Sequence, residues 1–181
     1  MGQYYVIANL SKKEYITPSA FGNGLKLMEF LCSGFGVLSG LGVLLASSNG
    51  NGGGDLWVPQ DTKWGDVPGR WAGDKIVIAG DYDDNPESAG FHIYKKCGDS
   101  TPMEQLLDAG GEMAVFKDVS DLVLGALLCD DWFRERFLEL PEALNDSQKT
   151  YYNEQQRSTW ERARPGETFP RDIIINTHAN I

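Results

Sequence analysis

An α+β fold is predicted, in which a mostly antiparallel sheet packs with two or three helices in a single domain covering residues 1–181. Segments rich in β-branched residues occur near the start, the middle and the end of the chain. Helical periodicity dominates the stretch between the second and the third of these segments. Strands and helices do not alternate regularly, as a parallel sheet would require. A hydrophobic content of 41% provides for one core in a chain of 181 residues.

The first elements are expected to be a hairpin followed by helices. QYYVIANL, residues 3–10, is rich in aromatic and β-branched residues and predicts a strand, and residues 15–17 return as its partner after the charged SKKEY turn. LKLMEF, residues 25–30, has helical character, and the glycine-rich segment 34–46 continues as a second or a broken helix. Gly36 and Gly40, four apart, would lie on one helix face and allow a neighbouring element to approach closely.

The middle of the chain combines predicted strands with one short helix. The apolar run at residues 75–80 is bounded by polar turns and predicts a strand. FHIY, residues 91–94, alternates between apolar and polar side chains, so we expect it to pair with that strand. A short helix is expected at residues 103–109 and a short strand at residues 112–116.

Two helices are predicted in the last third of the chain. Apolar residues with a period near 3.6 predict a long helix at 118–140, capped by Asp118 or Ser120. A largely polar helix is expected at 146–164, and a last strand at 172–176. The apolar contact points of the polar helix are Tyr151, Tyr152 and Trp160.

A long loop rich in Trp, Gly and Pro, residues 47–74, is the most distinctive segment. It carries Trp57, Trp64 and Trp71, seven residues apart, but its prolines and glycines exclude a coiled coil. Burying one indole removes about 200 Å² from water, so we expect the loop to be ordered against the core or against a partner. Tryptophan and arginine are frequent at binding hot spots, which makes Trp57, Trp64, Arg70 and Trp71 the candidate binding residues.

The glycine run of this loop suggests a second kind of site. Gly52, Gly53 and Gly54 could form a backbone nest that binds an anion, because glycine adopts left-handed dihedral angles easily. Phosphate-binding loops, however, usually join a strand to the N-terminus of a helix. Here the run follows a predicted helix and precedes a proline, so the context argues against a phosphate site.

An acidic cluster after the strand at 75–80 offers an enzymatic alternative. Asp81, Asp83 and Asp84, with Glu87, could hold Mg²⁺ in a small hydrolase or nucleotide-binding enzyme. The GDYDD segment resembles the Gly-Asp segment of calcineurin-like metallophosphatases and the nucleophile loop of haloacid dehalogenases, but the chain has only two histidines, in neither of the metallophosphatase motifs. A turn in which these carboxylates accept local backbone hydrogen bonds is the simpler interpretation. No other cofactor and no zinc site is expected.

Cysteine usage and hydropathy indicate a cytoplasmic protein. The three cysteines are widely separated, which argues against a disulfide framework. No secretory signal is evident at the start, and no apolar run approaches the ~20 residues that a membrane span needs. Cys97 lies beside Lys95 and Lys96, which would lower the pKa of its thiol, and His92 could serve as its base.

The net charge of −10 is concentrated in one region. Residues 74–140 carry fifteen acidic and six basic side chains, whereas the segments before and after are nearly balanced. Nucleic-acid binding is disfavoured, because a phosphate backbone requires a basic surface. A basic protein partner is compatible with this charge, and nothing in the sequence fixes the oligomeric state.

Four segments, GQYYVIANLSKKEY, FGNGLKLMEF, GNGGGD and WAGDKIVIAGDY, cover much of roughly the first 85 residues. Together they resemble a group of small uncharacterised proteins from bacteria and their phages. The resemblance implies no activity and no catalytic residue. With no complete catalytic set, the sequence favours a non-enzymatic binding protein of the inhibitor, immunity or anti-defence kind, acting through its acidic region and its tryptophan loop.

Overall fold

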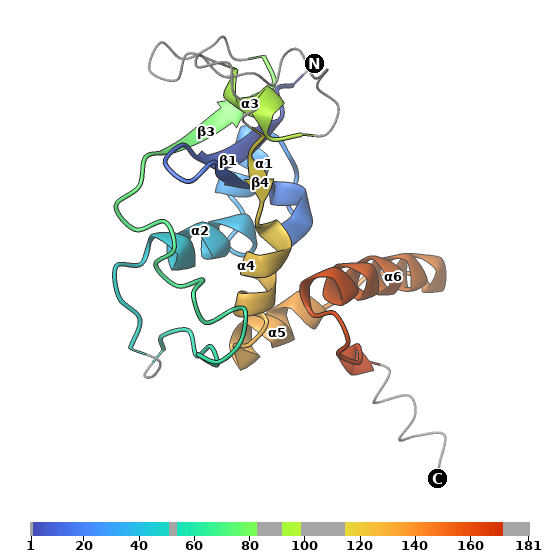
Figure 1. Ribbon diagram of the computed structural model, residues 1–181. Coiled ribbons are helices and arrows are strands. Elements are labelled where there is room, and N and C mark those ends of the chain that lie inside the picture. The colour runs from blue at the N-terminus through green and yellow to red at the C-terminus, as the bar shows by residue number, and fades with distance from the viewer. Residues whose placement is uncertain (1, 51–53, 83–91, 99–114, 172–181) are drawn as a thin grey trace.

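A four-stranded sheet with helices packed against it forms the body of the molecule (Figure 1). The computed structural model describes residues 2–50, 54–82, 92–98 and 115–171. The strands are β1 (Tyr5–Asn9), β2 (Glu14–Ile16), β3 (Ile76–Gly80) and β4 (Lys117–Asp118), in the order β3-β1-β2-β4. β1 pairs antiparallel with both β2 and β3, and only β2 and β4 are parallel. The predicted α+β fold is therefore confirmed.

β1 is buried on both faces of the sheet because its side chains alternate between two cores. Val6 and Ala8 belong to a small core, together with Ala79, Ile93, Cys97 and Phe116. Ile7 points the other way into the main core and lies opposite Ile16 and Ile78 in the ladder. The main core also contains the buried apolar side chains of the helices, including Phe30, Leu44, Val123, Leu124, Leu128 and Trp160.

The segment expected to pair with β3 as a strand is helical instead. α3 (Ile93–Lys96) packs against the small core, with Ile93 and Cys97, one helical turn apart, both buried. β3 pairs with β1 over five residue pairs and lies at the edge of the sheet, so the segment that follows it covers the small core without extending the ladder. The prediction of a strand at 91–94 was therefore wrong for its described residues, 92–94, because a run this short does not distinguish the two periods.

The two predicted N-terminal helices are present but begin later than expected, as α1 (Leu27–Leu31) and α2 (Val37–Leu45). A short helix before them, η1 (Pro18–Phe21), was not predicted. A side chain at Gly40 would come within 3.0 Å of Phe21 and Val123, so this glycine does permit close packing. Gly36 instead lies before the first turn of α2 with φ 120°, so the two glycines do not share a helix face.

The helix predicted at 118–140 is two helices, α4 (Ser120–Leu127) and α5 (Asp131–Leu138). Asp130 separates them: its carboxylate accepts a hydrogen bond from the amide of Phe133 at 2.9 Å and caps α5. Asp130 is therefore the N-cap of α5 and Asp131 is its first residue. The last helix, α6 (Asp146–Ala163), agrees with its prediction and extends to one side of the body (Figure 1).

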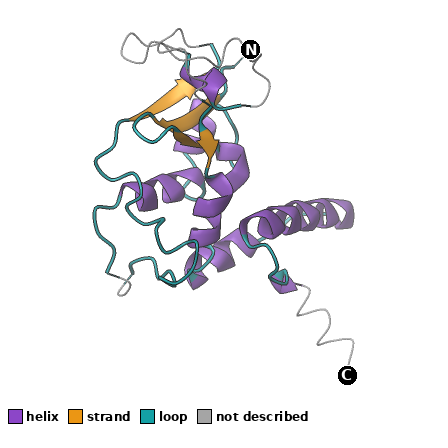
Figure 2. Cartoon of the chain, viewed as in Figure 1, coloured by secondary structure: helices purple, strands orange, loops and turns teal. Residues whose placement is uncertain are grey.

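A long connection joins α2 to β3, and its described parts contain neither helix nor strand (Figure 2). It runs past α4 and α5 before it returns to the sheet (Figure 1). The predicted helix at 103–109 and the predicted strand at 172–176 lie outside the described residues, as does most of the strand expected at 112–116.

Candidate functional site

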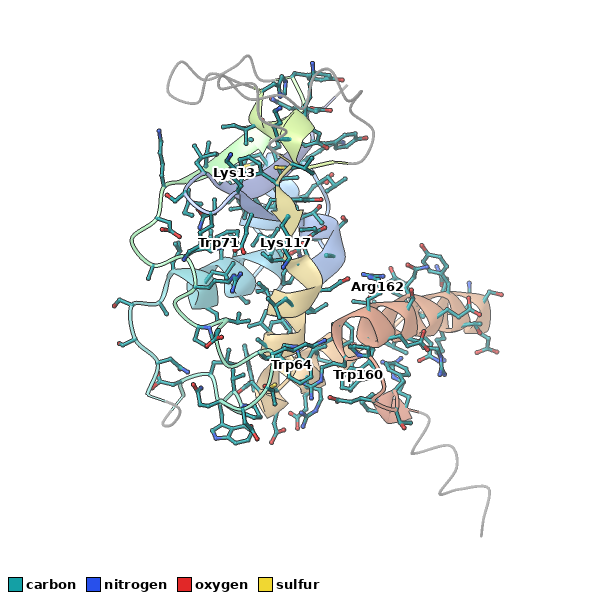
Figure 3. The ribbon with its side chains drawn as sticks, viewed as in Figure 1. Lys13, Trp64, Trp71, Lys117, Trp160 and Arg162 are labelled. Carbon is teal, nitrogen blue, oxygen red and sulfur yellow. The ribbon has the colours of Figure 1, made fainter. Side chains whose placement is uncertain are left out.

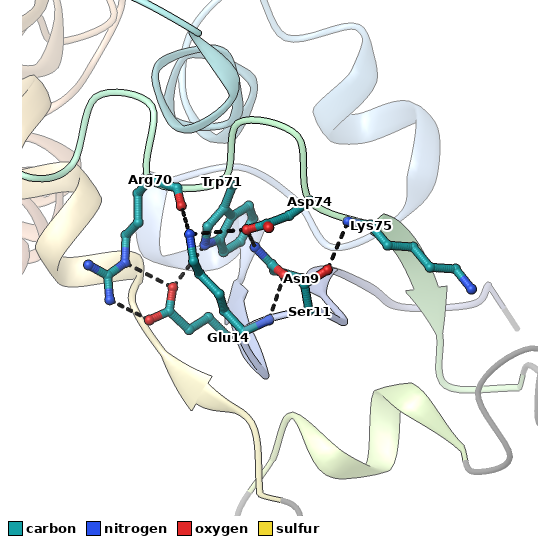
Figure 4. A network of polar contacts seen from close by, with 8 residues as sticks. Asn9, Ser11, Glu14, Arg70, Trp71, Asp74 and Lys75 are labelled. Carbon is teal, nitrogen blue, oxygen red and sulfur yellow. Dashed lines mark hydrogen bonds and ion pairs between the residues drawn. The ribbon is translucent and has the colours of Figure 1, made fainter.

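The end of the tryptophan loop is attached to the hairpin through Glu14 (Figure 4). The Oε2 atom of this carboxylate accepts hydrogen bonds from Arg70 Nε and Trp71 Nε1, each at 2.9 Å. Trp71 is fully buried in the main core, and Glu14 is buried as well. Burial alone would raise the pKa of Glu14, but the hydrogen bonds from Arg70 and Trp71 outweigh it and hold that pKa below its ordinary value.

A second set of polar contacts fixes the point where the loop enters β3 (Figure 4). Asn9 Nδ2 donates to Asp74 Oδ2 at 2.8 Å, and Lys12 Nζ lies 3.2 Å from the same oxygen. The hydrogen bond from Asn9, with help from Lys12, lowers the pKa of the Asp74 carboxyl. The amide of Lys75 donates to Ser11 Oγ at 3.1 Å. The turn between β1 and β2 is thus joined to the loop by side chains from both segments.

The same part of the loop also caps the end of α2. The amide of Gly69 donates to the carbonyl of Val43 at 2.9 Å, and the amide of Trp71 donates to that of Leu44 at 2.8 Å. These bonds satisfy carbonyl groups that a helix end leaves without partners. Gly69 has φ 77°, and a Cβ there would lie 2.7 Å from the carbonyl oxygen of Ala46. Only glycine fits this contact without strain.

The middle tryptophan of the loop, Trp64, packs against α4 and the end of α6 (Figure 3). The guanidinium carbon of Arg164 lies 4.0 Å from the centre of its ring. Arg164 Nη1 also donates to the carbonyl of Gly125 at 3.0 Å and to the sulfur of Cys129 at 2.9 Å. Trp64 and Arg164 therefore join the loop, α4 and the end of α6, and cation–π attraction adds to the packing.

The first tryptophan, Trp57, differs from the other two because 57% of its surface is exposed. It lines an open cavity of about 500 Å³, which we call the Trp57 hollow. The other lining residues are Pro59, Cys129, Asp130, Asp131, Arg134 and Arg164. Two of the four predicted binding residues, Arg70 and Trp71, lie elsewhere at the Glu14 contact, and Trp64 packs behind Arg164.

The charged groups of the Trp57 hollow are largely bound within the protein. Arg134 forms an ion pair with Asp131 and donates to the carbonyl of Leu128 at 3.3 Å. Arg164 is held by the contacts described above. The side chain of Asp131 remains 81% exposed despite its ion pair. The hollow thus presents the exposed Trp57 side chain beside the accessible carboxylate of Asp131.

Of the acidic cluster after β3, Asp81 lies within the described residues. Asp81 extends the ladder between β1 and β3: its amide donates to the carbonyl of Tyr4, and its Oδ1 accepts from the amide of Tyr4, both at 3.0 Å. This contact is to a backbone group 77 residues away, so it is not the local turn that the simpler interpretation predicted. Asp83, Asp84 and Glu87 lie outside the described residues. Within the described ranges, no group of three His, Cys, Asp or Glu side chains is arranged to hold a metal ion.

Two other sequence-based candidates have different outcomes. Cys97 is buried in the small core, and this burial raises the pKa of its thiol well above the ordinary value. The expected lowering of that pKa by Lys95 and Lys96 was therefore wrong. Of the proposed anion nest, Gly52 and Gly53 lie outside the described residues, whereas Gly54 has φ 103°.

Sequence reasoning missed Glu14, Cys129 and Arg164. Glu14 lies 56 residues from Arg70 and looked like one charged residue in a turn. Arg164 stood at the end of a polar helix, where a basic residue needs no special explanation. No local pattern marks such residues, because their partners are brought close only by the tertiary fold.

Comparisons with known proteins return no relative. The chain matches no protein-family model, and no curated protein or solved structure matches it. Among the helices of the described residues, none has both the length and the apolar character to cross a membrane.

Proposed function

We propose that the protein is a non-enzymatic binding protein that recognises a basic surface of a partner protein at the Trp57 hollow. One observation carries the proposal: Trp57 is exposed, while the next two tryptophans of the loop are packed into the fold. An exposed indole gains free energy when a partner covers it, and tryptophan is enriched at binding hot spots.

Attachment of the loop supports this role. Trp64 is held by Arg164, and Trp71 is held by Glu14 and the main core, so the chain beyond Trp57 is fixed at two points. A loop that is already fixed loses little conformational entropy when it binds. In this proposal, Trp64 and Trp71 hold the loop in position, and Trp57 contacts the partner.

The charge of the chain indicates the chemistry of the partner. The net charge is −10, and Asp130 and Asp131 belong to the acidic region 74–140. A lysine or arginine placed over Trp57 would gain about 0.5–2 kcal/mol from the cation–π interaction alone. Long-range attraction would also accelerate association with a basic partner.

An inhibitor, immunity or anti-defence role is consistent with this surface. A basic surface on a partner often serves to bind a phosphate-rich or otherwise acidic ligand. An acidic protein that covers this surface competes directly with that ligand. Such a protein needs no catalytic residues of its own, only a fixed acidic surface and an apolar anchor.

The decisive experiment compares Trp57→Ala with Tyr82→Ala. Tyr82 is equally exposed but follows β3, at the sheet, whereas the hollow lies at the start of α5. Proteins retained from a cell extract by the immobilised wild type are identified, purified and titrated by calorimetry. We expect Trp57→Ala to weaken binding by at least about tenfold, with Tyr82→Ala unchanged, and added salt to weaken the wild-type complex. Equal affinity of wild type and Trp57→Ala, or an acidic partner, would refute the proposal.

A further inference from the structure

A second cavity lies between α6 and the segments that precede α2. It measures about 570 Å³ and shares no lining residue with the Trp57 hollow. We call it the tyrosine groove, after two tyrosines of α6 that line it. Its lining includes Asn23, Phe35, Glu139, Tyr151, Tyr152 and Gln156.

Aromatic rings form the walls of the tyrosine groove. Phe35 on one side is fixed by stacking on Phe133, with the ring centres 4.3 Å apart. On the other side, Tyr151 and Tyr152 meet edge to face at 5.8 Å and are 59% and 40% exposed. The sequence predicted that these tyrosines would contact the core. Instead they remain accessible beside the groove, and a partner could cover them.

Two of the side-chain amides that line the groove are bound within the protein. The side-chain amide of Asn23 donates to the carbonyl of Phe35 at 3.1 Å and accepts from the amide of Val37 at 2.7 Å. Gln156 Nε2 donates to the carbonyl of Phe137 at 2.7 Å, while its own Oε1 is sealed from solvent. No described strand lines the cavity, so a partner cannot extend the sheet here. A ligand therefore gains most from contact with the aromatic rings of the groove.

Glu139 is the only charged residue among those that line the groove. Its side chain is 61% exposed, and its ion pair with Arg136 is exposed on both sides. Exposed pairs of this kind contribute little stability, so a cation of a ligand can take the place of Arg136 at low cost. Charge complementarity thus selects a ligand with a basic residue next to its apolar part.

Among peptides, a proline-rich segment meets these conditions best. Proline has no amide hydrogen, so a proline-rich segment needs few hydrogen-bond acceptors from the groove, and its extended form does not depend on internal hydrogen bonds. Its preformed shape also limits the entropy lost on binding to aromatic walls. We propose that the tyrosine groove binds an extended, proline-rich segment of a partner protein whose Lys or Arg reaches Glu139. This proposal does not depend on binding at the Trp57 hollow.

The test uses fluorescein-labelled synthetic peptides and the full-length protein. A defined set carries a Pro-x-x-Pro core with Arg or Lys at either end. Two matched sets replace the prolines by alanine or the basic residue by glutamate. Binding is followed by fluorescence anisotropy. We expect binding within the first set, and a loss of at least about tenfold in affinity, roughly 1.4 kcal/mol, in each matched set.

Protein variants connect binding to the groove. The double variant Tyr151→Ala/Tyr152→Ala changes exposed positions of α6 to a good helix former, so the fold should persist, as circular dichroism verifies. We expect it to lose at least about tenfold in affinity for the best peptide, whereas Trp57→Ala binds like wild type. Glu139→Gln should weaken binding of the basic peptide but not of a peptide without the basic residue.

Three results would overturn the proposal. The first is the absence of binding across the whole proline set. The second is equal binding of the alanine-substituted peptides, which would indicate a helical ligand. The third is a dimer, detected by sedimentation, that the double tyrosine variant dissociates, because a second copy would then occupy the groove.

Discussion

Glu14 illustrates how one buried carboxylate can connect distant segments. It sits in β2, yet its oxygens accept hydrogen bonds from two consecutive residues of the tryptophan loop. Removing its charge would leave the donors of Arg70 and Trp71 facing an amide, which also presents donors. The position therefore controls both the core around Trp71 and the end of the loop.

We expect Glu14→Gln to lower the free energy of unfolding by about 1.5–3 kcal/mol, the range for hydrogen bonds to charged groups. Urea denaturation at pH 7 measures this value. Glu29→Gln is the matched control, because the pair between Lys26 and Glu29 is exposed and should contribute little. An equal loss in both variants would contradict the assignment.

The difference in stability between wild type and Glu14→Gln should depend on pH. The pKa of Glu14 in the folded chain lies below its ordinary value of 4.5. Its stabilising effect is therefore complete above that ordinary value and is lost as the pH falls through the lower, folded value. The stability gap between wild type and Glu14→Gln should close during acidification from about pH 5. Denaturation curves at a series of pH values test this, and a gap that stays constant or widens would contradict it.

At the scale of single residues, the sequence identified the large aromatic residues of the loop, but not which of them are buried. Trp57, Trp64 and Trp71 have the same spacing and similar neighbours. Only the tertiary fold determines that Trp71 is buried and that Trp57 is exposed. Composition predicts that an indole needs to be covered, but it does not predict what covers it.

At the scale of elements, Gly125 allows three segments to meet on α4. A Cβ at this position would lie 2.3 Å from Trp64 Nε1 and 2.6 Å from the carbonyl oxygen of Ala163. We expect Gly125→Ala to destabilise the fold by about 1–3 kcal/mol, although alanine is the better helix former. Thermal and urea unfolding measure the change.

Gly42→Ala provides the opposite result as a control. Gly42 lies within α2, and a Cβ there meets nothing within 4 Å. Alanine should therefore stabilise the protein by up to about 1 kcal/mol through helix propensity alone. If both variants were stabilised, Trp64 and the end of α6 would not pack on α4 as described.

Prediction of the elements succeeded where the pattern was long and failed where the backbone had a local alternative. β1, β3 and α6 followed from strand composition and from the length of the polar helix. The break between α4 and α5 was missed because the apolar period continues across it. The side chain of Asp130 competes with the helix for a backbone amide, and this competition does not change the period.

At the scale of the whole molecule, α6 is attached unevenly. Trp160 and Ala163 in its last turns are buried, whereas most of the helix before them is exposed. Few buried apolar contacts imply a low free energy of local opening. We expect the amides in the first half of α6 to exchange with deuterium faster than those of β1, as measured by mass spectrometry or NMR. Protection of that half equal to the protection of β1 would contradict this expectation.

The position of β1 between two partners has a consequence for synthesis on the ribosome. Its first partner, β2, follows after a short turn, but its second partner pairs Tyr5 with Gly80. One edge of this buried strand therefore stays open until η1, α1, α2 and the whole tryptophan loop have been made. Open strand edges favour aggregation, and contacts between distant residues form slowly. The nascent chain is most vulnerable in this interval, before the loop carries β3 back to the sheet.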